Sequence, residues 1–94
     1  MPGKVTLTVR IGDDEVDRYI LSGPLIRIGR APEAEVQIEN VGVSRLHAQI
    51  EEDPAEGHVL VDLGSTNGTY LNGRQVKRAP IRNGDLIEVG SLRI

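Results

Sequence analysis

The sequence predicts an all-β fold, a sandwich or barrel of about ten short strands. Apolar and polar residues alternate over short runs, and glycine, proline or asparagine separates these runs every several positions. No segment carries a helical period of useful length. The 94 residues include two tyrosines but no phenylalanine or tryptophan, so the core is expected to consist of valine, leucine and isoleucine, which favour strands.

The first half of the chain is expected to form strands that each end at turn residues. They cover residues 4–11, 16–21, 25–28, 35–38 and 46–50. In the last of them, the alternation directs Leu46, Ala48 and Ile50 toward the core. The same alternation directs His47 and Gln49 outward, toward solvent.

The second half is expected to continue in the same way. Its extended segments cover residues 58–63, 69–71, 74–76, 79–81, 86–89 and 92–94. Asn-Gly pairs at 67–68, 72–73 and 83–84 mark tight turns, because both residue types tolerate a positive φ angle. The acidic segment 51–57 is expected to be a solvated turn. The length suits one core and leaves no room for a second, so residues 1–94 are expected to be a single domain.

Composition and charge narrow the classes of function. The net charge of −3 argues against a general nucleic-acid binder, and the few aromatic residues provide no platform for base stacking. The absence of cysteine removes thiolate metal sites and fits a reducing compartment. No stretch resembles a signal peptide or a membrane span. We therefore expect a cytoplasmic domain, monomeric in isolation, that uses no cofactor or metal and binds neither nucleic acid nor membrane.

Polar residues suited to an anion lie on three loops at strand ends. Arg30 closes a strand and offers a planar fork that can hold a phosphate through two parallel hydrogen bonds. Ser44 and Arg45 precede another strand and add a hydroxyl and a second charge. Thr66 and Asn67 lie in a glycine-rich loop and add a hydroxyl and an amide. Together these groups are chemically sufficient to bind a phosphate carried by a peptide.

Other interpretations of these residues remain open at this point. Arg30 could be a surface charge paired with Glu33 or Glu35, and Arg45 a solvated loop residue. A catalytic triad of Ser44, His47 or His58, and Asp62 is disfavoured by the sequence around the serine. The sequence around the serine lacks the final glycine and the helix of a nucleophile elbow. A metal site and a nucleotide-binding loop have no support, since no ligand cluster and no GxxxxGK motif are present.

The order and spacing of these motifs resemble the forkhead-associated (FHA) domain signature over residues 25–89. The resembling residues are Gly29, Arg30, Ser44, His47, Thr66, Asn67, Gly68, Asn72 and Gly73. This family is among the readers of phosphorylated motifs. The resemblance implies a two-sheet β-sandwich of about eleven short, mostly antiparallel strands with its recognition loops at one end. It also implies a phosphothreonine-dependent protein-binding module with no catalytic residue that forms part of a larger protein.

The resemblance also implies a role for each matching residue. Arg30, Ser44, Arg45 and Thr66 are expected to bind the phosphate, with Thr66 also shaping a pocket for the threonine methyl group. Asn67 is expected to hold the backbone of the ligand. The remaining residues are expected to be structural: Gly29, His47, Gly68, Asn72 and Gly73.

Selectivity for the residues around the phosphothreonine is less well defined. Some family members read the third residue after the phosphothreonine with a side chain two positions before the motif serine, but here that position is Gly42. A basic segment at 73–82 could offer a secondary surface, but the pattern favours a solvated face of edge strands. The alternative function is the same fold used as a phosphate-independent surface for another protein or another domain.

Overall fold

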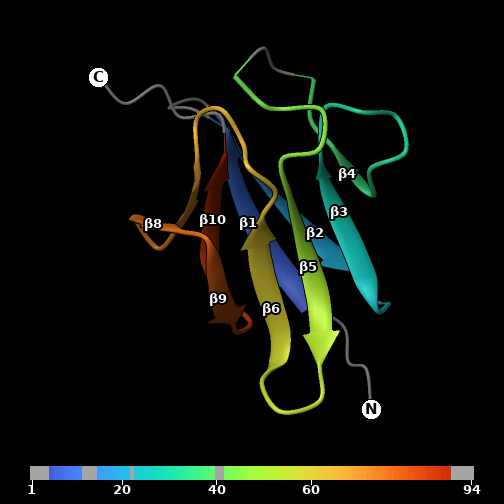
Figure 1. Ribbon diagram of the computed structural model, residues 1–94, viewed down its shortest axis with the longest axis vertical. Coiled ribbons are helices and arrows are strands. Elements are labelled where there is room, and N and C mark those ends of the chain that lie inside the picture. The colour runs from blue at the N-terminus through green and yellow to red at the C-terminus, as the bar shows by residue number, and fades with distance from the viewer. Residues whose placement is uncertain (1–4, 12–14, 22, 40–41, 90–94) are drawn as a thin grey trace.

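The computed structural model describes residues 5–11, 15–21, 23–39 and 42–89, which form two five-stranded sheets and no helix. The first sheet has the order β2 (Glu15–Leu21), β1 (Val5–Ile11), β10 (Leu86–Val89), β7 (Thr69–Leu71) and β8 (Arg74–Val76). The second has the order β4 (Val36–Gln37), β3 (Leu25–Gly29), β5 (Ala48–Asp53), β6 (Gly57–Asp62) and β9 (Arg78–Ile81). The predicted all-β sandwich is confirmed (Figure 1).

Most neighbouring strands run antiparallel, as expected. The exceptions among the described strands are the parallel pairs β1 with β10 and β3 with β4. The described strands number ten, and the additional segment predicted at 92–94 lies outside the described residues. No described segment is a helix long and apolar enough to cross a membrane.

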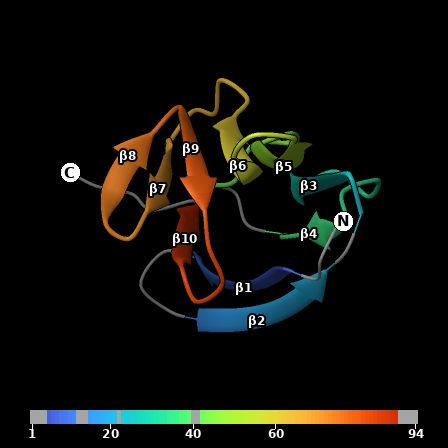
Figure 2. The same cartoon turned by 90° about the horizontal axis from the view of Figure 1, so that it is seen from below.

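The two sheets pack face to face over an aliphatic core (Figure 2). Ile26 and Ile28 of β3 are fully buried and alternate with the half-buried Arg27, as a strand with one face on the core requires. Ile87 and Val89 reach the same core from β10. The predicted aliphatic core is therefore confirmed for the described residues.

The bounds predicted for the strand at 46–50 and for the acidic turn at 51–57 are wrong, as are the directions predicted for Leu46 and His47. The inward directions predicted for Ala48 and Ile50 are confirmed. The strand, β5, begins at Ala48 and extends to Asp53, because the turn to β6 takes only residues 54–56. Leu46 is 49% exposed and His47 is fully buried, the reverse of the prediction. Both residues precede the strand, in a segment that folds across its end, so period-two alternation does not apply to them.

The hairpin between β7 and β8 has the predicted Asn-Gly turn. Asn72 and Gly73 have φ angles of 50° and 88°, and the flanking residues Leu71 and Arg74 are paired. Only these two residues separate the strands, which is the geometry of a two-residue hairpin loop. The turn at Asn72 therefore fixes the register of the short strands that follow the candidate site.

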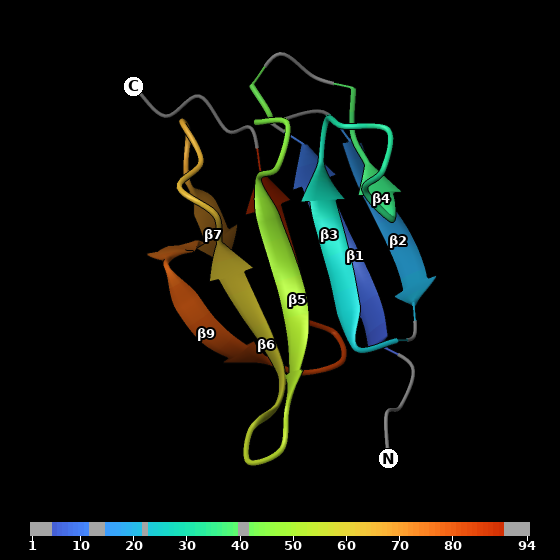
Figure 3. The same ribbon diagram turned by 45° about the vertical axis from the view of Figure 1, so that its right-hand side comes forward.

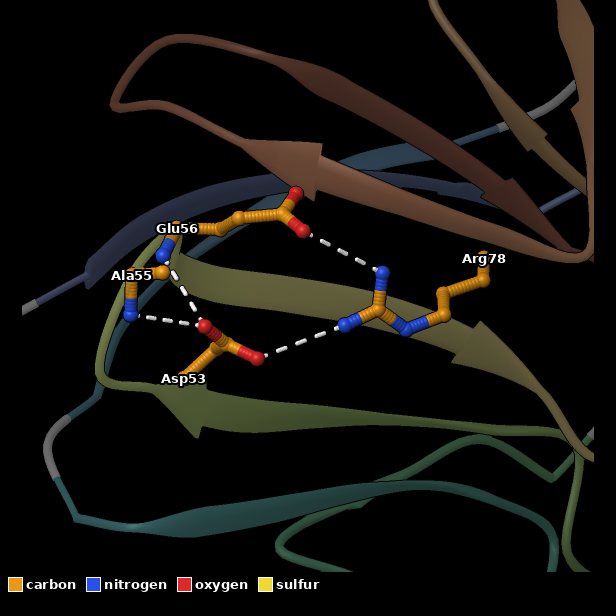
Figure 4. Close-up of polar contacts among 4 residues, drawn as sticks. All are labelled: Asp53, Ala55, Glu56 and Arg78. Carbon is orange, nitrogen blue, oxygen red and sulfur yellow. Dashed lines mark hydrogen bonds and ion pairs between the residues drawn. The ribbon is translucent and has the colours of Figure 1, made fainter.

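The turn between β5 and β6 marks the opposite end of the sandwich from the loops considered below (Figure 1). Asp53 accepts hydrogen bonds from the backbone N–H groups of Ala55 and Glu56. Arg78 of β9 pairs with the carboxylates of Asp53 and Glu56, each at 3.4 Å (Figure 4). This cluster closes the turn and compensates the charge of Arg78.

Candidate functional site

Three loops meet at the end of the sandwich where β3 and β6 finish and β5 begins (Figure 3). We call this the recognition end, and it consists of residues 30–35, 42–47 and 63–68. Backbone hydrogen bonds join the first two loops directly. The N–H of Arg30 donates to the carbonyl of Ser44 at 3.0 Å, and that of Ala31 donates to the carbonyl of Arg45 at 3.1 Å.

Gly29 allows this close approach of the first two loops. A Cβ atom at position 29 would lie 2.2 Å from the carbonyl oxygen of Arg45 and 3.1 Å from that of Ser44. No side chain fits there without moving the backbone that carries both residues. The steric requirement therefore accounts for a glycine directly before Arg30.

The imidazole of His47 connects the second loop to the third, which we call the recognition loop. Its Nδ1 accepts the backbone N–H of Ser44 at 3.1 Å, and its Nε2 lies 2.8 Å from the carbonyl oxygen of Gly68. These partners assign a neutral ring with its proton on Nε2, because an N–H donor faces one nitrogen and an acceptor faces the other. Both ring nitrogens are thus used structurally, inside the protein.

Two further hydrogen bonds hold the recognition loop against residues 42–44. The Oγ of Ser44 accepts the N–H of Thr66 at 3.1 Å, which leaves the hydroxyl hydrogen of Ser44 for another acceptor. The Nδ2 of Asn67 donates to the carbonyl of Gly42 at 2.8 Å. The side-chain oxygen of Asn67 has no hydrogen-bond partner among the described residues. The two loops therefore leave one hydroxyl donor and one amide acceptor for a ligand.

The recognition end carries two guanidinium groups without a carboxylate partner among the described residues. Arg30 donates through Nε to the carbonyl of Val43 at 3.0 Å, so its two Nη atoms remain for a ligand. The side chain of Arg45 is exposed and forms no ion pair within the described part of the chain. Glu35 pairs instead with Arg27 at 3.0 Å. The proposal that Arg30 is compensated by Glu35 is therefore wrong.

Asp62 organises the recognition loop, a role that the sequence interpretation missed. Its carboxylate accepts the N–H groups of Gly64 and Ser65 at 3.0 and 3.2 Å, the Ser65 hydroxyl at 2.5 Å and the Thr69 hydroxyl at 2.7 Å. Burial raises the pKa of this carboxyl, but the hydrogen bonds from Ser65, Thr69 and Gly64 outweigh it and lower the pKa below its ordinary value. The sequence signal was available, since an aspartate often bonds the N–H two residues ahead in a turn.

Asn72, in the hairpin between β7 and β8, is bonded to the start of β10 in the same sheet. The side-chain oxygen of Asn72 accepts the N–H of Leu86 at 2.9 Å, and its Nδ2 donates to Asp85 at 3.2 Å. Gly68 has a φ angle of 86°, in the left-handed region that favours glycine. These residues set the backbone conformation of the recognition loop and of the hairpin that follows it.

The residues of the hypothetical triad are not arranged for catalysis. His47 bonds the backbone N–H of Ser44 rather than its hydroxyl, and the carboxylate of Asp62 is occupied by its own loop. His58 lies on β6 beside Glu52, at 4.0 Å, toward the other end of the strand. Within the described ranges, no group of three His, Asp or Glu side chains could hold a metal ion.

A comparison of the sequence with protein-family profiles identifies the family of this chain. The sequence profile of the FHA domain matches residues 26–90. The chain belongs to the FHA family. The resemblance to this family is thereby confirmed, and the matched residues include the three loops of the recognition end.

The FHA domain matches curated relatives over nearly all of its own length. It is 37% identical over 93 residues to the glycogen accumulation regulator GarA of Mycobacterium tuberculosis, covering 99% of this chain and 57% of the relative. It is 36% identical over 92 residues to the oxoglutarate dehydrogenase inhibitor of Corynebacterium glutamicum, covering 98% of this chain and 64% of the relative. The domain thus spans less than two thirds of the length of these relatives.

Solved FHA domains share the fold. A domain from a study of phosphothreonine-dependent FHA interactions superimposes with a TM-score of 0.75 at 34% identity, covering 94% of this chain and 88% of that one. The FhaA FHA domain, solved in complex with the intracellular domain of Rv3910, gives a TM-score of 0.70 at 36% identity, covering 83% and 85%.

Proposed function

We propose that this FHA domain binds phosphothreonine in a partner protein and acts as a regulatory module within a longer protein. The observation that carries the proposal is the uncompensated positive charge of Arg30 and Arg45 beside the hydroxyl of Ser44. Fixed charge without a counter-ion stabilises an anionic ligand, and a phosphate dianion offers acceptors for all three groups. The lengths of the relatives and the regulatory names of GarA and the oxoglutarate dehydrogenase inhibitor support the second part.

Each predicted ligand contact has a geometric basis in this proposal. The two Nη atoms of Arg30 and the hydroxyl hydrogen of Ser44 donate to phosphate oxygens, and Arg45 adds charge from the rim. Thr66, exposed at the turn of the recognition loop, contacts the phosphate and the methyl group of the ligand. The side-chain oxygen of Asn67 accepts a hydrogen bond from a backbone N–H of the partner.

The remaining motif residues act by holding these groups in place. Gly29 admits the loop that carries Ser44, and His47 joins that loop to the recognition loop. Gly68, Asn72 and Gly73 set the backbone behind the site. We infer no catalytic activity, since FHA domains are binding modules and the polar side chains here hold loops. The cytoplasmic location, the monomeric state and the single-domain extent of residues 1–94 stay predictions.

A peptide titration tests the proposal. The probe is a fluorescein-labelled peptide library with degenerate positions around a central phosphothreonine, compared with the same library carrying threonine or phosphoserine. We expect binding only with phosphate, stronger for phosphothreonine than for phosphoserine. Binding should weaken below about pH 6, where the phosphate loses its second charge, and at high salt.

The Arg30→Ala variant identifies the phosphate site. A charge-assisted hydrogen bond contributes about 1.5–3 kcal/mol, so we expect at least a roughly tenfold loss of affinity with an unchanged melting temperature. Arg82→Ala is the matched control, because Arg82 is exposed near the end of β9 and forms no ion pair among the described residues. Equal binding by wild type and Arg30→Ala would refute the placement of the site. Equal binding of the phosphorylated and unphosphorylated libraries would favour the phosphate-independent alternative.

A further inference from the structure

We propose that Gln75, in β8, and Lys77, directly after β8, form a second part of the binding surface that favours an acidic residue near the phosphothreonine. We call these two residues the β8 rim. The inference rests on the proposed function and names a chemical preference of the same partner. It assigns selectivity to a strand outside the three loops of the recognition end.

Gln75 lies directly over the recognition loop. A Cβ atom built on Gly68 would lie 2.7 Å from Nε2 of Gln75 and 3.4 Å from its Cδ, so the amide covers the residue next to Asn67. The Gln75 side chain is exposed, and no hydrogen bond engages its amide within the described part of the chain. A partner backbone held by Asn67 therefore passes within reach of a second amide.

Lys77 lies beside the base of the same loop. Its carbonyl oxygen accepts the N–H of Asp62 at 2.9 Å, and the Asp62 carboxylate in turn binds the N–H groups of Gly64 and Ser65. In Figure 1, β8 lies on the same side of the molecule as the recognition loop and just below it. The chain thus carries Lys77 to the loop at the point where it crosses from the first sheet to the second.

The charge of Lys77 is available for a partner. Its side chain is exposed and forms no ion pair with the described residues, whereas its neighbour Arg78 is paired with Asp53 and Glu56. The two consecutive cations therefore differ. Arg78 closes a turn of this protein, whereas Lys77 has no carboxylate partner among the described residues. A carboxylate on a bound partner is the chemically matched occupant of such a position.

Gly42 has no side chain that would supply this selectivity. Gly42 is buried, and its carbonyl oxygen already accepts the amide of Asn67. Gly42 therefore supplies no charge preference, whereas the β8 rim is adjacent to the loop that holds Asn67 and carries the charge of Lys77. An extended peptide advances about 3.3 Å per residue, so the acidic residue is expected within about four positions of the phosphothreonine.

The test uses an array of phosphothreonine peptides with alanine at all flanking positions except one. Aspartate, alanine or lysine is placed in turn at each of about four positions on either side. Wild-type protein is expected to bind one or two aspartate peptides about threefold to fivefold more tightly than the all-alanine peptide, the range for an exposed ion pair. It is expected to bind the corresponding lysine peptides more weakly than the all-alanine peptide.

Variants then locate the preference on the β8 rim. Lys77→Ala should remove the preference for aspartate while binding the all-alanine phosphopeptide as wild type does, and Lys77→Glu should reverse the preference toward lysine. Gln75→Ala should weaken every phosphopeptide by about twofold to threefold without changing the order of preference. Arg82→Ala, with an exposed cation near the far end of β9, should retain the wild-type pattern.

The outcomes separate this inference from the proposed function. Phosphate-dependent binding with no preference for aspartate, or with a preference that survives Lys77→Glu, overturns the inference and leaves the proposed function intact. An unchanged affinity of Gln75→Ala overturns the role of its amide. No difference between phosphorylated and unphosphorylated peptides would instead overturn the proposed function, and the inference with it.

Discussion

The Asp62 carboxylate holds the recognition loop, so its removal should loosen that loop without deleting any proposed phosphate contact. Two substitutions separate the contribution of the negative charge from that of the hydrogen bonds. Asp62→Ala removes all four hydrogen bonds from Gly64, Ser65 and Thr69. Asp62→Asn has the same shape but no charge, and it keeps one oxygen acceptor for the loop.

The size of the effect follows from these contacts. A hydrogen bond to a charged group contributes about 1.5–3 kcal/mol, but Asp62 is half-buried and water replaces part of what is lost. We therefore expect Asp62→Ala to lower the free energy of unfolding by about 3 kcal/mol and Asp62→Asn by about half of that. Urea unfolding at neutral pH measures both values. Since ordering the loop then costs part of the binding energy, peptide affinity should fall about tenfold in Asp62→Ala.

The pH dependence of unfolding gives a second signature of the same carboxylate. Because the folded state lowers the pKa of Asp62, the ionised group stabilises the fold above the unfolded pKa, near 3.8. This contribution is lost as the pH falls through the folded pKa. The difference in stability between wild type and Asp62→Asn should therefore be full at neutral pH and shrink progressively below about pH 4.

Asp53 provides the matched control for Asp62. It also accepts two backbone N–H groups in a turn, those of Ala55 and Glu56, and these bonds lower its pKa. It lies at the far end of the sandwich, so Asp53→Ala should destabilise folding while leaving peptide affinity unchanged (Figure 1). The reasoning is refuted if Asp62→Ala unfolds like wild type, or if it and Asp53→Ala lose affinity equally.

Two further predictions concern the neighbouring loop. Gly29→Ala should destabilise the fold by about 1–3 kcal/mol and weaken peptide binding, because the new methyl would lie 2.2 Å from the Arg45 carbonyl oxygen; thermal melts that match wild type would contradict this. Hydrogen bonds from the side chain and the backbone N–H of Arg27 lower the pKa of Glu35 to about 2. An NMR titration should find this value in wild type and a higher one in Arg27→Ala, which removes the guanidinium but keeps the backbone N–H donor. A Glu35 pKa unchanged by that substitution would show that the pair is not the cause.

The strands and the family followed from local patterns in the sequence. Alternation over residues 4–11 predicted β1, because a half-buried strand needs a two-residue period. The Asn-Gly pair at 72–73 predicted its hairpin, since its φ angles are a property of those two residues. The resemblance to the FHA signature implied that the loops of Arg30 and Ser44 contribute to one site, and backbone hydrogen bonds join these loops in the structure.

The partners of individual side chains were decided only by the tertiary structure. His47 was expected to face solvent, yet it is buried because two loops from distant parts of the chain close over its ring. Glu35 pairs with Arg27 rather than with Arg30. Periodicity and turn propensity act over a few residues, whereas these contacts join segments up to 21 residues apart. Which charges remain free for a phosphate therefore depends on how the loops pack, and that is a property of the folded chain alone.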